Sequence, residues 1–252
     1  MEQEKQVSSV KPKKQKITKS FTLLSNAIEE WWKNLGKFVM MYVWGILLAL
    51  VPMIILGGLS VLDNLTASGG MAMRIVIVVI ATICMLFVLY FFIRSYAGLF
   101  LLVKKNYQGK TWDIYKETKK YFWPYFGLVI LTSVFILLWS LLLIIPGIIF
   151  SILYAMAVYI FFFEGKKGMT AIKASVRLVK GYWWPLFGRF VLLGVILWIF
   201  MMFVSIPLYV FEENGALFNA WNVVVQIVSF LIGPISLLFG YNIYKDLVKL
   251  KK

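Results

Sequence analysis

A chain of 252 residues that is 62% hydrophobic does not have the composition of a soluble domain, in which about 45–50% of the residues are apolar. The mean hydropathy of +0.85 favours an integral membrane protein and excludes an ordinary soluble enzyme. A net charge of +15 would suggest nucleic-acid binding in a soluble protein, but here the basic residues flank apolar segments, as they do in multi-pass membrane proteins. We therefore expect membrane lipids as partners, and no nucleic acid.

The chain begins with a basic segment. Residues 1–19 hold six lysines and two glutamates and almost no large apolar side chains, which is typical of a disordered tail. No apolar segment of the kind found in a cleavable signal peptide occurs in the first 37 residues. The remainder, residues 20–252, is expected to form a single membrane domain.

Six apolar segments follow the tail. A helix needs about 20 apolar residues to cross the hydrocarbon core of a bilayer. The segments that meet or approach this length are 38–59, 75–97, 125–145, 147–163, 190–210 and 221–242. Pro146-Gly147 separates the third from the fourth and predicts a tight turn. The sequence therefore predicts an all-α, polytopic membrane protein with six transmembrane helices.

The basic residues are distributed unevenly between the loops. Of 26 lysines and arginines, 25 fall in residues 1–37, 94–120, 166–189 and 245–252, whereas Arg74 stands apart. If the six segments cross the membrane in alternating directions, the 25 lie on one side. Because positive side chains are retained on the cytoplasmic side, we expect both termini in the cytoplasm.

The phrase Trp-x-x-x-Gly occurs three times at a border between charged and apolar sequence, each time after another aromatic residue. Aromatic side chains at such borders favour the headgroup layer. The six expected interface anchors are Trp31, Trp32, Phe122, Trp123, Trp183 and Trp184. The recurrence predicts three repeated units, 20–103, 104–163 and 164–252. The glycines of the phrase, at 36, 127 and 188, could serve close helix packing or a bend.

A short segment with helical periodicity precedes each phrase. The apolar positions of the first segment are Phe21, Leu24, Ile28 and Trp31, and those of the third are Met169, Ile172, Val176 and Val179; the second segment is weaker. Amphipathic helices beside a span tend to lie in the membrane interface. Gly181 predicts a helix end, and Pro124 and Pro185 suit the first turn of the next helix. Each unit is thus expected to hold an interfacial helix and a hairpin of two spans.

Residues 164–184 carry a pattern of small residues that ends on a glycine and an aromatic pair. The positions that carry it are Glu164, Gly168, Ala171, Ser175, Leu178, Gly181 and Trp184. The pattern resembles the membrane domain attached to some bacterial glycerophosphoryl diester phosphodiesterases, and related stand-alone six-span membrane proteins. The resemblance implies an architecture and a location in the bacterial inner membrane. It does not imply hydrolase activity, because the catalytic domain of those proteins is not seen in this sequence.

Residues for catalysis are scarce. The chain has no histidine and one cysteine, so an imidazole base and metal sites made of histidines or clustered cysteines are excluded. No nucleophile elbow or phosphate-binding loop occurs. We expect no catalytic, cofactor-binding or metal-binding residues, no cofactor and no enzymatic activity.

Two sets of residues are candidates for binding. The possible contacts to lipid phosphate are Arg94, Lys104, Lys105, Lys173, Arg177 and Arg189. For Arg94 and Arg189, extension of the side chain toward the headgroups from a span end is the simpler explanation. In the last span, Asn222, Gln226 and Ser229 share one helical face ahead of a break predicted at Gly233-Pro234. This face could line a polar cavity or form hydrogen bonds between helices.

The sequence favours a non-enzymatic inner-membrane protein, associated with lipid or the envelope as a scaffold or accessory. The alternative is a transporter of small solutes or lipid that uses the polar face of the last span. The sequence does not indicate which protein, if any, is a partner.

Overall fold

The computed structural model describes residues 18–65, 71–211, 213 and 215–251, and within them the chain is helical without a β-strand. The elements are α1 (Ser20–Leu65), α2 (Met71–Lys104), α3 (Thr111–Leu142), α4 (Ile144–Tyr154), α5 (Ala157–Glu164), α6 (Gly168–Val179), α7 (Trp183–Ser205), the 3-10 helix η1 (Ile206–Tyr209) and α8 (Ala216–Leu250). Six segments are long and apolar enough to cross a membrane: α1, α2, α3, α4 with α5, α7 with η1, and α8. The all-α fold with six candidate spans is thus confirmed. Residues 1–17 of the expected tail lie outside the described residues.

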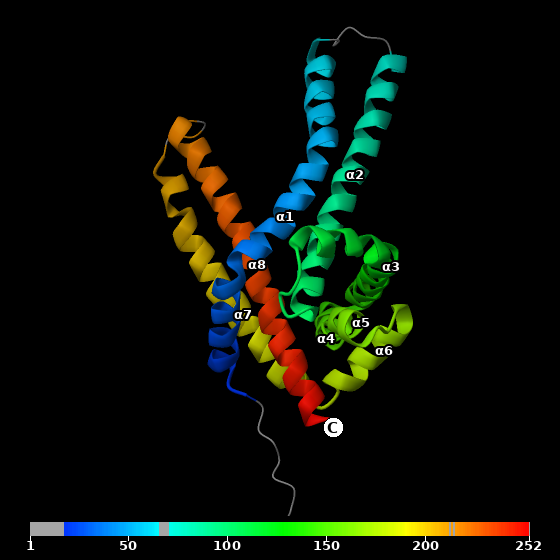
Figure 1. The fold of residues 1–252 in the computed structure, drawn as a ribbon, viewed down its shortest axis with the longest axis vertical. Helices are drawn as coiled ribbons and strands as arrows, with labels where there is room; N and C mark the ends of the chain where they lie inside the picture. Colours follow the sequence, from blue (N-terminus) through cyan, green and yellow to red (C-terminus); the bar gives the residue numbers. More distant parts are fainter. Residues whose placement is uncertain (1–17, 66–70, 212, 214, 252) are drawn as a thin grey trace, which may run out of the picture.

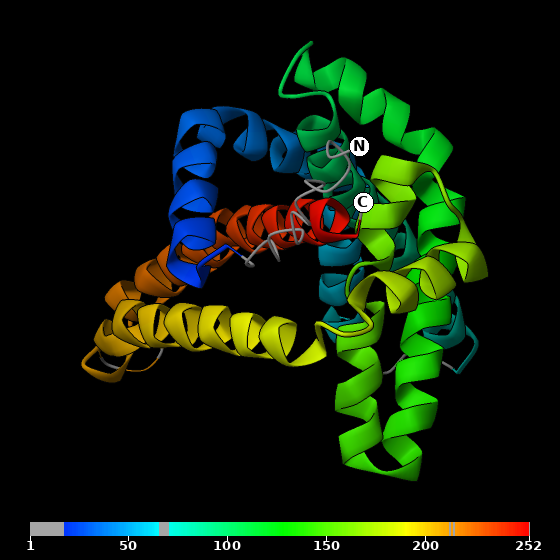
Figure 2. The same ribbon diagram turned by 90° about the horizontal axis from the view of Figure 1, so that it is seen from below.

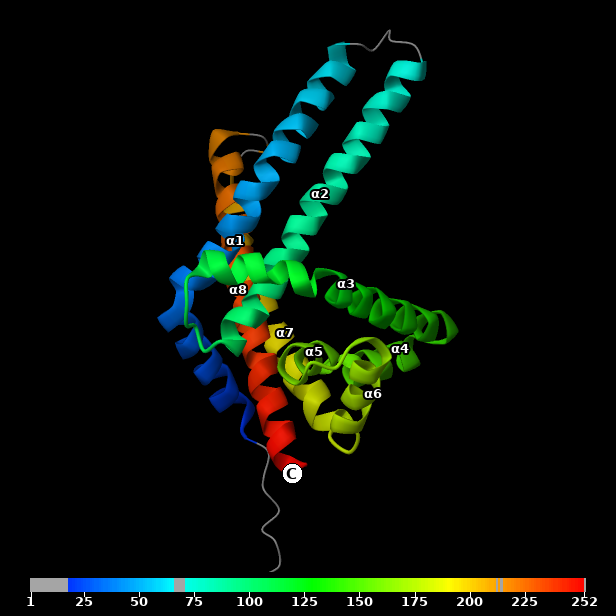
Figure 3. The same cartoon turned by 45° about the vertical axis from the view of Figure 1, so that its right-hand side comes forward.

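The long helices pair into three hairpins that diverge. Helix α1 packs against α2, α3 against α4, and α7 against α8. The α1–α2 and α7–α8 hairpins separate from one another in Figure 1, and the α3–α4 hairpin extends sideways in Figure 3. Their outer parts expose large apolar side chains, among them Ile54 (70%), Leu138 (51%) and Trp198 (67%). Lipid tails are as apolar as these side chains, so a bilayer removes the driving force to bury them.

The hydrophobic core lies at the opposite end, where the hairpins converge. We call this end the hub, and it comprises residues 19–41, 97–122, 156–180 and 235–251. Fully buried side chains from five helices meet in it: Phe38, Leu99, Tyr115, Phe162 and Phe239. With the exception of Arg74, Arg94 and Arg189, every described lysine and arginine belongs to the hub. The core and the basic residues therefore occupy the same end of the molecule.

Helix α5 is the centre of the hub. Five of its eight residues are buried, and it packs against α2, α3 and α6. Phe162 stacks on Phe100 of α2 with ring centroids 4.7 Å apart and 5° between the planes. The Tyr159 hydroxyl donates a hydrogen bond to the Leu237 carbonyl of α8 at 3.1 Å. This short helix thus joins the hairpins to one another.

Two glycines allow close contacts between helices. A Cβ atom on Gly240 of α8 would lie 2.1 Å from the Tyr159 Oη, and one on Gly45 of α1 would lie 1.9 Å from the Ser95 Oγ. By contrast, a Cβ atom on any of the three glycines of the Trp-x-x-x-Gly phrase would meet nothing within 4 Å. Close packing within the described chain therefore does not explain those three glycines.

The turn between α3 and α4 differs from the prediction. It lies at Leu143, whose backbone is extended (φ −161°, ψ 143°), and not at Pro146-Gly147. Pro146 stands in the first turn of α4, where its missing N–H leaves no helical hydrogen bond unmade. Gly147 instead lets α4 approach Ser140, whose Cα lies 3.0 Å from a Cβ built on the glycine.

The tip of this hairpin is entirely aliphatic. Five consecutive side chains are between 68% and 76% exposed: Leu141, Leu142, Leu143, Ile144 and Ile145. The fourth candidate span is also interrupted, because α4 ends at Tyr154 and α5 begins at Ala157.

Four other predictions concern helix ends. Gly181 is confirmed as a helix end, because α6 stops at Val179 and Gly181 adopts a φ of +91°. Pro185 is confirmed in the first turn of α7. Pro124 and the Gly233-Pro234 pair were wrong as boundaries, since they lie inside α3 and α8. A proline removes one helical hydrogen bond and bends a helix without necessarily ending it, and α3 is bent (Figure 2).

The amphipathic segments are helical, but their burial differs from the expectation. In α1 the buried residues are Leu23 and Ala27, whereas Phe21 is 70% and Ile28 44% exposed. Leu24 and Trp31 are partly buried against the core, so the protein covers only half of the predicted apolar positions and leaves Phe21 and Ile28 outward. Helix α1 also turns sharply within its dark blue first part (Figure 2).

In α6 the opposite occurs. Ile172 and Val179 are buried, because the apolar face of the helix packs against α3, α4 and α5. A hydrogen bond from the Ser175 hydroxyl to the Leu153 carbonyl of α4, 2.6 Å long, holds the helix on the protein.

Substitution of Gly240 by alanine should destabilise the hub. The new methyl group would overlap the buried Tyr159 ring, and overpacking of this kind costs about 1–3 kcal/mol. We expect a lower thermal unfolding midpoint in detergent for Gly240→Ala. The matched control is Gly194→Ala in α7, where a Cβ would meet nothing within 4 Å. Tyr159→Phe should restore part of the loss in the Gly240→Ala protein, and equal midpoints for Gly240→Ala and Gly194→Ala would contradict the assignment.

Candidate lipid-contact site

The tryptophan of each Trp-x-x-x-Gly phrase is equally exposed in all three copies. Trp32 is 69%, Trp123 is 73% and Trp184 is 75% exposed. The preceding aromatic ring is turned toward the protein each time: Phe122 is 7% exposed, and Trp31 and Trp183 are half-buried against the core. Each phrase therefore presents one ring outward and anchors the other inside.

Hydrogen bonds and ring contacts hold the inner aromatic residues. The Trp31 indole donates to the Leu231 carbonyl at 2.9 Å, and the Trp183 indole to the Ile149 carbonyl at 3.1 Å. In the second copy Phe126 stacks on the inner ring of Phe122, with centroids 5.7 Å apart and 8° between the planes. In the third copy Phe187 stacks on the inner ring of Trp183 in the same way, at 5.1 Å and 7°. Phe126 and Phe187 also contact the exposed tryptophans Trp123 and Trp184 edge-on, with centroid distances of 6.3 and 6.1 Å. In the first copy Leu35 takes this place.

Arg94 points into the protein. It is 8% exposed, and its Nε and Nη2 donate to the Thr118 hydroxyl and the Tyr115 carbonyl, both at 3.0 Å. Its guanidinium carbon lies 4.7 Å from the centroid of the Tyr115 ring, a cation–π contact. Lys104 and Lys105 are exposed, and Lys105 forms an ion pair with Glu117. The structure therefore does not gather these three predicted residues around one anion.

Arg189 is also buried, at 5% exposure. Its Nη1 lies 4.0 Å from the Asp246 Oδ2 of α8, and its Nη2 donates to the Thr18 carbonyl. Breaking such a buried pair would leave an uncompensated charge. Arg189 thus links α7 to α8 and to the segment before α1.

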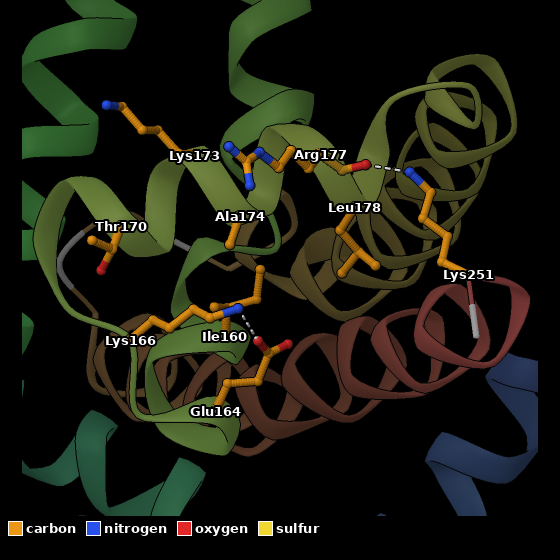
Figure 4. Close-up of a pocket in the computed structure, with 9 residues that line it drawn as sticks. All are labelled: Ile160, Glu164, Lys166, Thr170, Lys173, Ala174, Arg177, Leu178 and Lys251. Atoms are coloured by element: carbon orange, nitrogen blue, oxygen red, sulfur yellow. Dashed lines mark hydrogen bonds and ion pairs between the residues drawn. The ribbon is translucent and has the colours of Figure 1, made fainter.

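The remaining two predicted cations, Lys173 and Arg177, line one groove. The groove has a volume of about 650 Å³ and lies between α5, α6 and the end of α8. Figure 4 shows its other polar lining residues, Lys166, Thr170 and Lys251, around an apolar floor. We call it the basic groove, because four of its lining side chains are cationic and one, Glu164, is acidic.

The single carboxylate of the basic groove is already engaged. Glu164 accepts a hydrogen bond from Lys166 at 2.7 Å and another from the Tyr244 hydroxyl at 2.9 Å. Lys251 donates to the Arg177 and Lys180 carbonyls at the end of α6. Partial burial and then repulsion by Lys180 lower the pKa of Lys251. The groove therefore has an excess of positive charge.

The polar face of α8 is less concentrated than expected. Gln226 and Ser229 are exposed and Asn222 is half-buried, and the Ser229 hydroxyl donates to the Val225 carbonyl of its own helix. Ser229 lines a groove of about 590 Å³ between α1, α2, α3 and α8, whose lining includes neither Asn222 nor Gln226. The structure thus places one of the three residues in a groove.

Comparison of the chain with family models, with curated proteins and with solved structures gave no match. The resemblance of residues 164–184 to the phosphodiesterase-associated membrane domain therefore stays a prediction. Several positions of that pattern have local structural roles. Gly168 and Gly181 adopt φ angles of +49° and +91°, which glycine tolerates best, and Ala171 and Ser175 are fully buried.

Sequence reasoning missed three residues of the basic groove: Lys166, Thr170 and Lys251. The first two stand beside the predicted cations in the chain, and a helical wheel would have placed Thr170 on the same side as Arg177. Lys251 lies 74 residues beyond Arg177, and no local pattern connects them. In the part of the chain that the structure describes, no group of His, Cys, Asp and Glu could hold a metal ion.

Replacement of Arg94 by lysine should destabilise the protein. Lysine lacks the planar fork that reaches Thr118 and Tyr115 together, and hydrogen bonds to charged groups contribute about 1.5–3 kcal/mol. We expect a lower unfolding midpoint for Arg94→Lys, and none of this loss for Lys104→Gln, which removes an exposed charge. An Arg94→Lys protein as stable as wild type but weaker in binding anionic lipid would show that Arg94 serves lipid contact instead.

Proposed function

We propose that this chain is a non-enzymatic membrane protein, a scaffold or accessory of the envelope, that gathers anionic lipid around its basic hub. It is held at the headgroup layer by the aromatic pairs of its three Trp-x-x-x-Gly phrases (Trp31-Trp32, Phe122-Trp123 and Trp183-Trp184), which we call the elbows. The observation that carries the proposal is the equal exposure of Trp32, Trp123 and Trp184, at 69–75%. Indole rings favour the headgroup layer, so three outward rings at corresponding positions of the repeated phrase support contact with the membrane surface.

The distribution of charge supports the same orientation. The hub carries nearly all of the described basic residues, and each Lys or Arg near an anionic surface contributes about 1 kcal/mol of attraction. The two arginines outside it that face the core, Arg94 and Arg189, have protein partners. By the asymmetry of the basic residues, the hub lies on the cytoplasmic side. The bacterial inner membrane as location rests on the resemblance of residues 164–184.

The ring geometry supports three repeated units. The second and third elbows share the same arrangement of three rings, and the first retains its inner and outer tryptophans at a centroid distance of 5.7 Å. Each elbow precedes one hairpin. We infer that each unit contributes one anchor to the membrane surface and one hairpin to its interior.

The depth of the elbow tryptophans tests the proposal. In vesicles with brominated phospholipids, the fluorescence of one elbow tryptophan is the difference between the wild-type protein and its Trp32→Phe, Trp123→Phe or Trp184→Phe variant. This fluorescence should be quenched most by bromine near the glycerol end of the acyl chain. Trp198→Phe is the control, because this exposed ring stands near the middle of the fifth candidate span and should be quenched most by bromine near the methyl end. Deep quenching of all three elbow rings would refute the anchoring role.

Preference for anionic lipid tests the electrostatic part. Spin-labelled phosphatidylglycerol should associate with the reconstituted protein several-fold more strongly than spin-labelled phosphatidylcholine at low salt. The preference should fall toward unity near 1 M salt, where the Debye length is about 3 Å. Equal association of the two lipids at low salt would exclude the gathering of anionic lipid by the hub.

A further inference from the structure

Lys173 and Arg177 lie at the border of two grooves on adjacent sides of α6. One is the basic groove. The other, of about 600 Å³, lies between α6 and the α3–α4 hairpin, and we call it the apolar groove. Because the two cations are four residues apart, they stand one above the other on the helix. They are lining residues of both grooves.

The two grooves differ in chemistry. Apart from the two shared cations, the apolar groove is lined by aromatic, aliphatic and methionine side chains, with Phe135, Leu138, Trp139 and Leu142 on the α3 side. Leu138 and Leu142 belong to the exposed outer part of the hairpin, so the groove opens where lipid tails would lie. The basic groove has an excess of positive charge and two hydrogen-bonding side chains beside it, Thr170 and Lys166.

Neither shared cation forms an ion pair with another described residue. Lys166 turns toward Glu164, whereas the Lys173 ammonium points away from that carboxylate and the Arg177 guanidinium lies over Ala174 (Figure 4). Helix α6 contains no acidic residue. Like charges at this spacing on a helix are destabilising, and a phosphate diester between them would remove the repulsion and accept charge-assisted hydrogen bonds.

We propose that this border is a binding site for one anionic phospholipid. Lys173 and Arg177 hold the phosphate, the basic groove receives the headgroup, and the apolar groove receives an acyl chain. A headgroup that carries its own ammonium is disfavoured, because it would meet the cationic Lys166 and Lys251. This proposal rests on the proposed function, which it narrows from a basic surface to a single defined site.

Native mass spectrometry of the full chain in detergent, titrated with phosphatidylglycerol, tests the site. We expect one tightly held lipid per chain, with an affinity at least ten-fold higher than that for phosphatidylcholine. The double variant Lys173→Gln/Arg177→Gln should lose at least ten-fold in affinity for phosphatidylglycerol. The control Lys119→Gln/Lys120→Gln removes the same charge from exposed positions of α3 that line neither groove, and should lose at most two-fold.

A second pair of variants tests the apolar groove. Leu138→Trp places a larger ring in the groove and should weaken phosphatidylglycerol binding several-fold. Leu137→Trp makes the same change at the neighbouring exposed position (59%), which does not line the groove, and should leave binding unchanged. Both changes are apolar and suit a lipid-facing surface, so folding is expected to be retained.

The outcomes separate this proposal from the one before it. Equal loss in the two double variants would overturn the defined site while leaving the diffuse attraction of anionic lipid in place. Equal weakening by Leu138→Trp and Leu137→Trp would overturn the acyl groove. Glycerol phosphate or inorganic phosphate binding as tightly as the phospholipid would show that the ligand is a soluble phosphate compound and overturn the lipid assignment. No preference of the wild-type chain for anionic lipid in either experiment would remove the proposed function as well.

Discussion

The packing of α5 inside the hub is the interaction on which the rest of the structure depends. The three hairpins share little surface along their outer parts, and their outward apolar side chains gain nothing from association in lipid. The aromatic rings of α5 contact α2 and α3, Tyr159 bonds to α8, and Phe163 stacks on Tyr241 of α8 at 4.5 Å. An eight-residue helix thus holds together spans of more than 30 residues.

The location of this core explains why the basic end of the molecule has a defined shape. A surface of lysines on mobile loops attracts anionic lipid without selecting a position. Here the same charges project from helices that are buried on their other face, so that Lys173, Arg177 and Lys251 have a fixed framework. Arg94 and Arg189 contribute to that framework by turning inward, where they bond to α3 and α8.

Local sequence patterns predicted what depends on neighbouring residues. Hydropathy identified the six candidate spans because each segment has to meet lipid along its whole length. Gly181 marked the end of α6 because the chain there adopts a positive φ angle, which glycine tolerates best. Proline was less informative: Pro124 and Pro234 stayed inside helices, since neighbouring turns tolerate one lost hydrogen bond. The exposure of Phe21 and Ile28 was not predictable from periodicity, because α1 has apolar side chains on two faces and only the tertiary structure decides which of them are covered. The same holds for the basic groove, where Lys251 is brought to α6 by the packing of α8.

The aliphatic turn between α3 and α4 has a consequence for topology. A loop that emerges into water needs polar side chains to hydrate it, and Leu141 to Ile145 provide none. In a bilayer, nothing in this turn favours its extension beyond the hydrocarbon core on the far side, and the hairpin can end within that core. The middle hairpin would then be hidden from anything that approaches from the compartment opposite the hub.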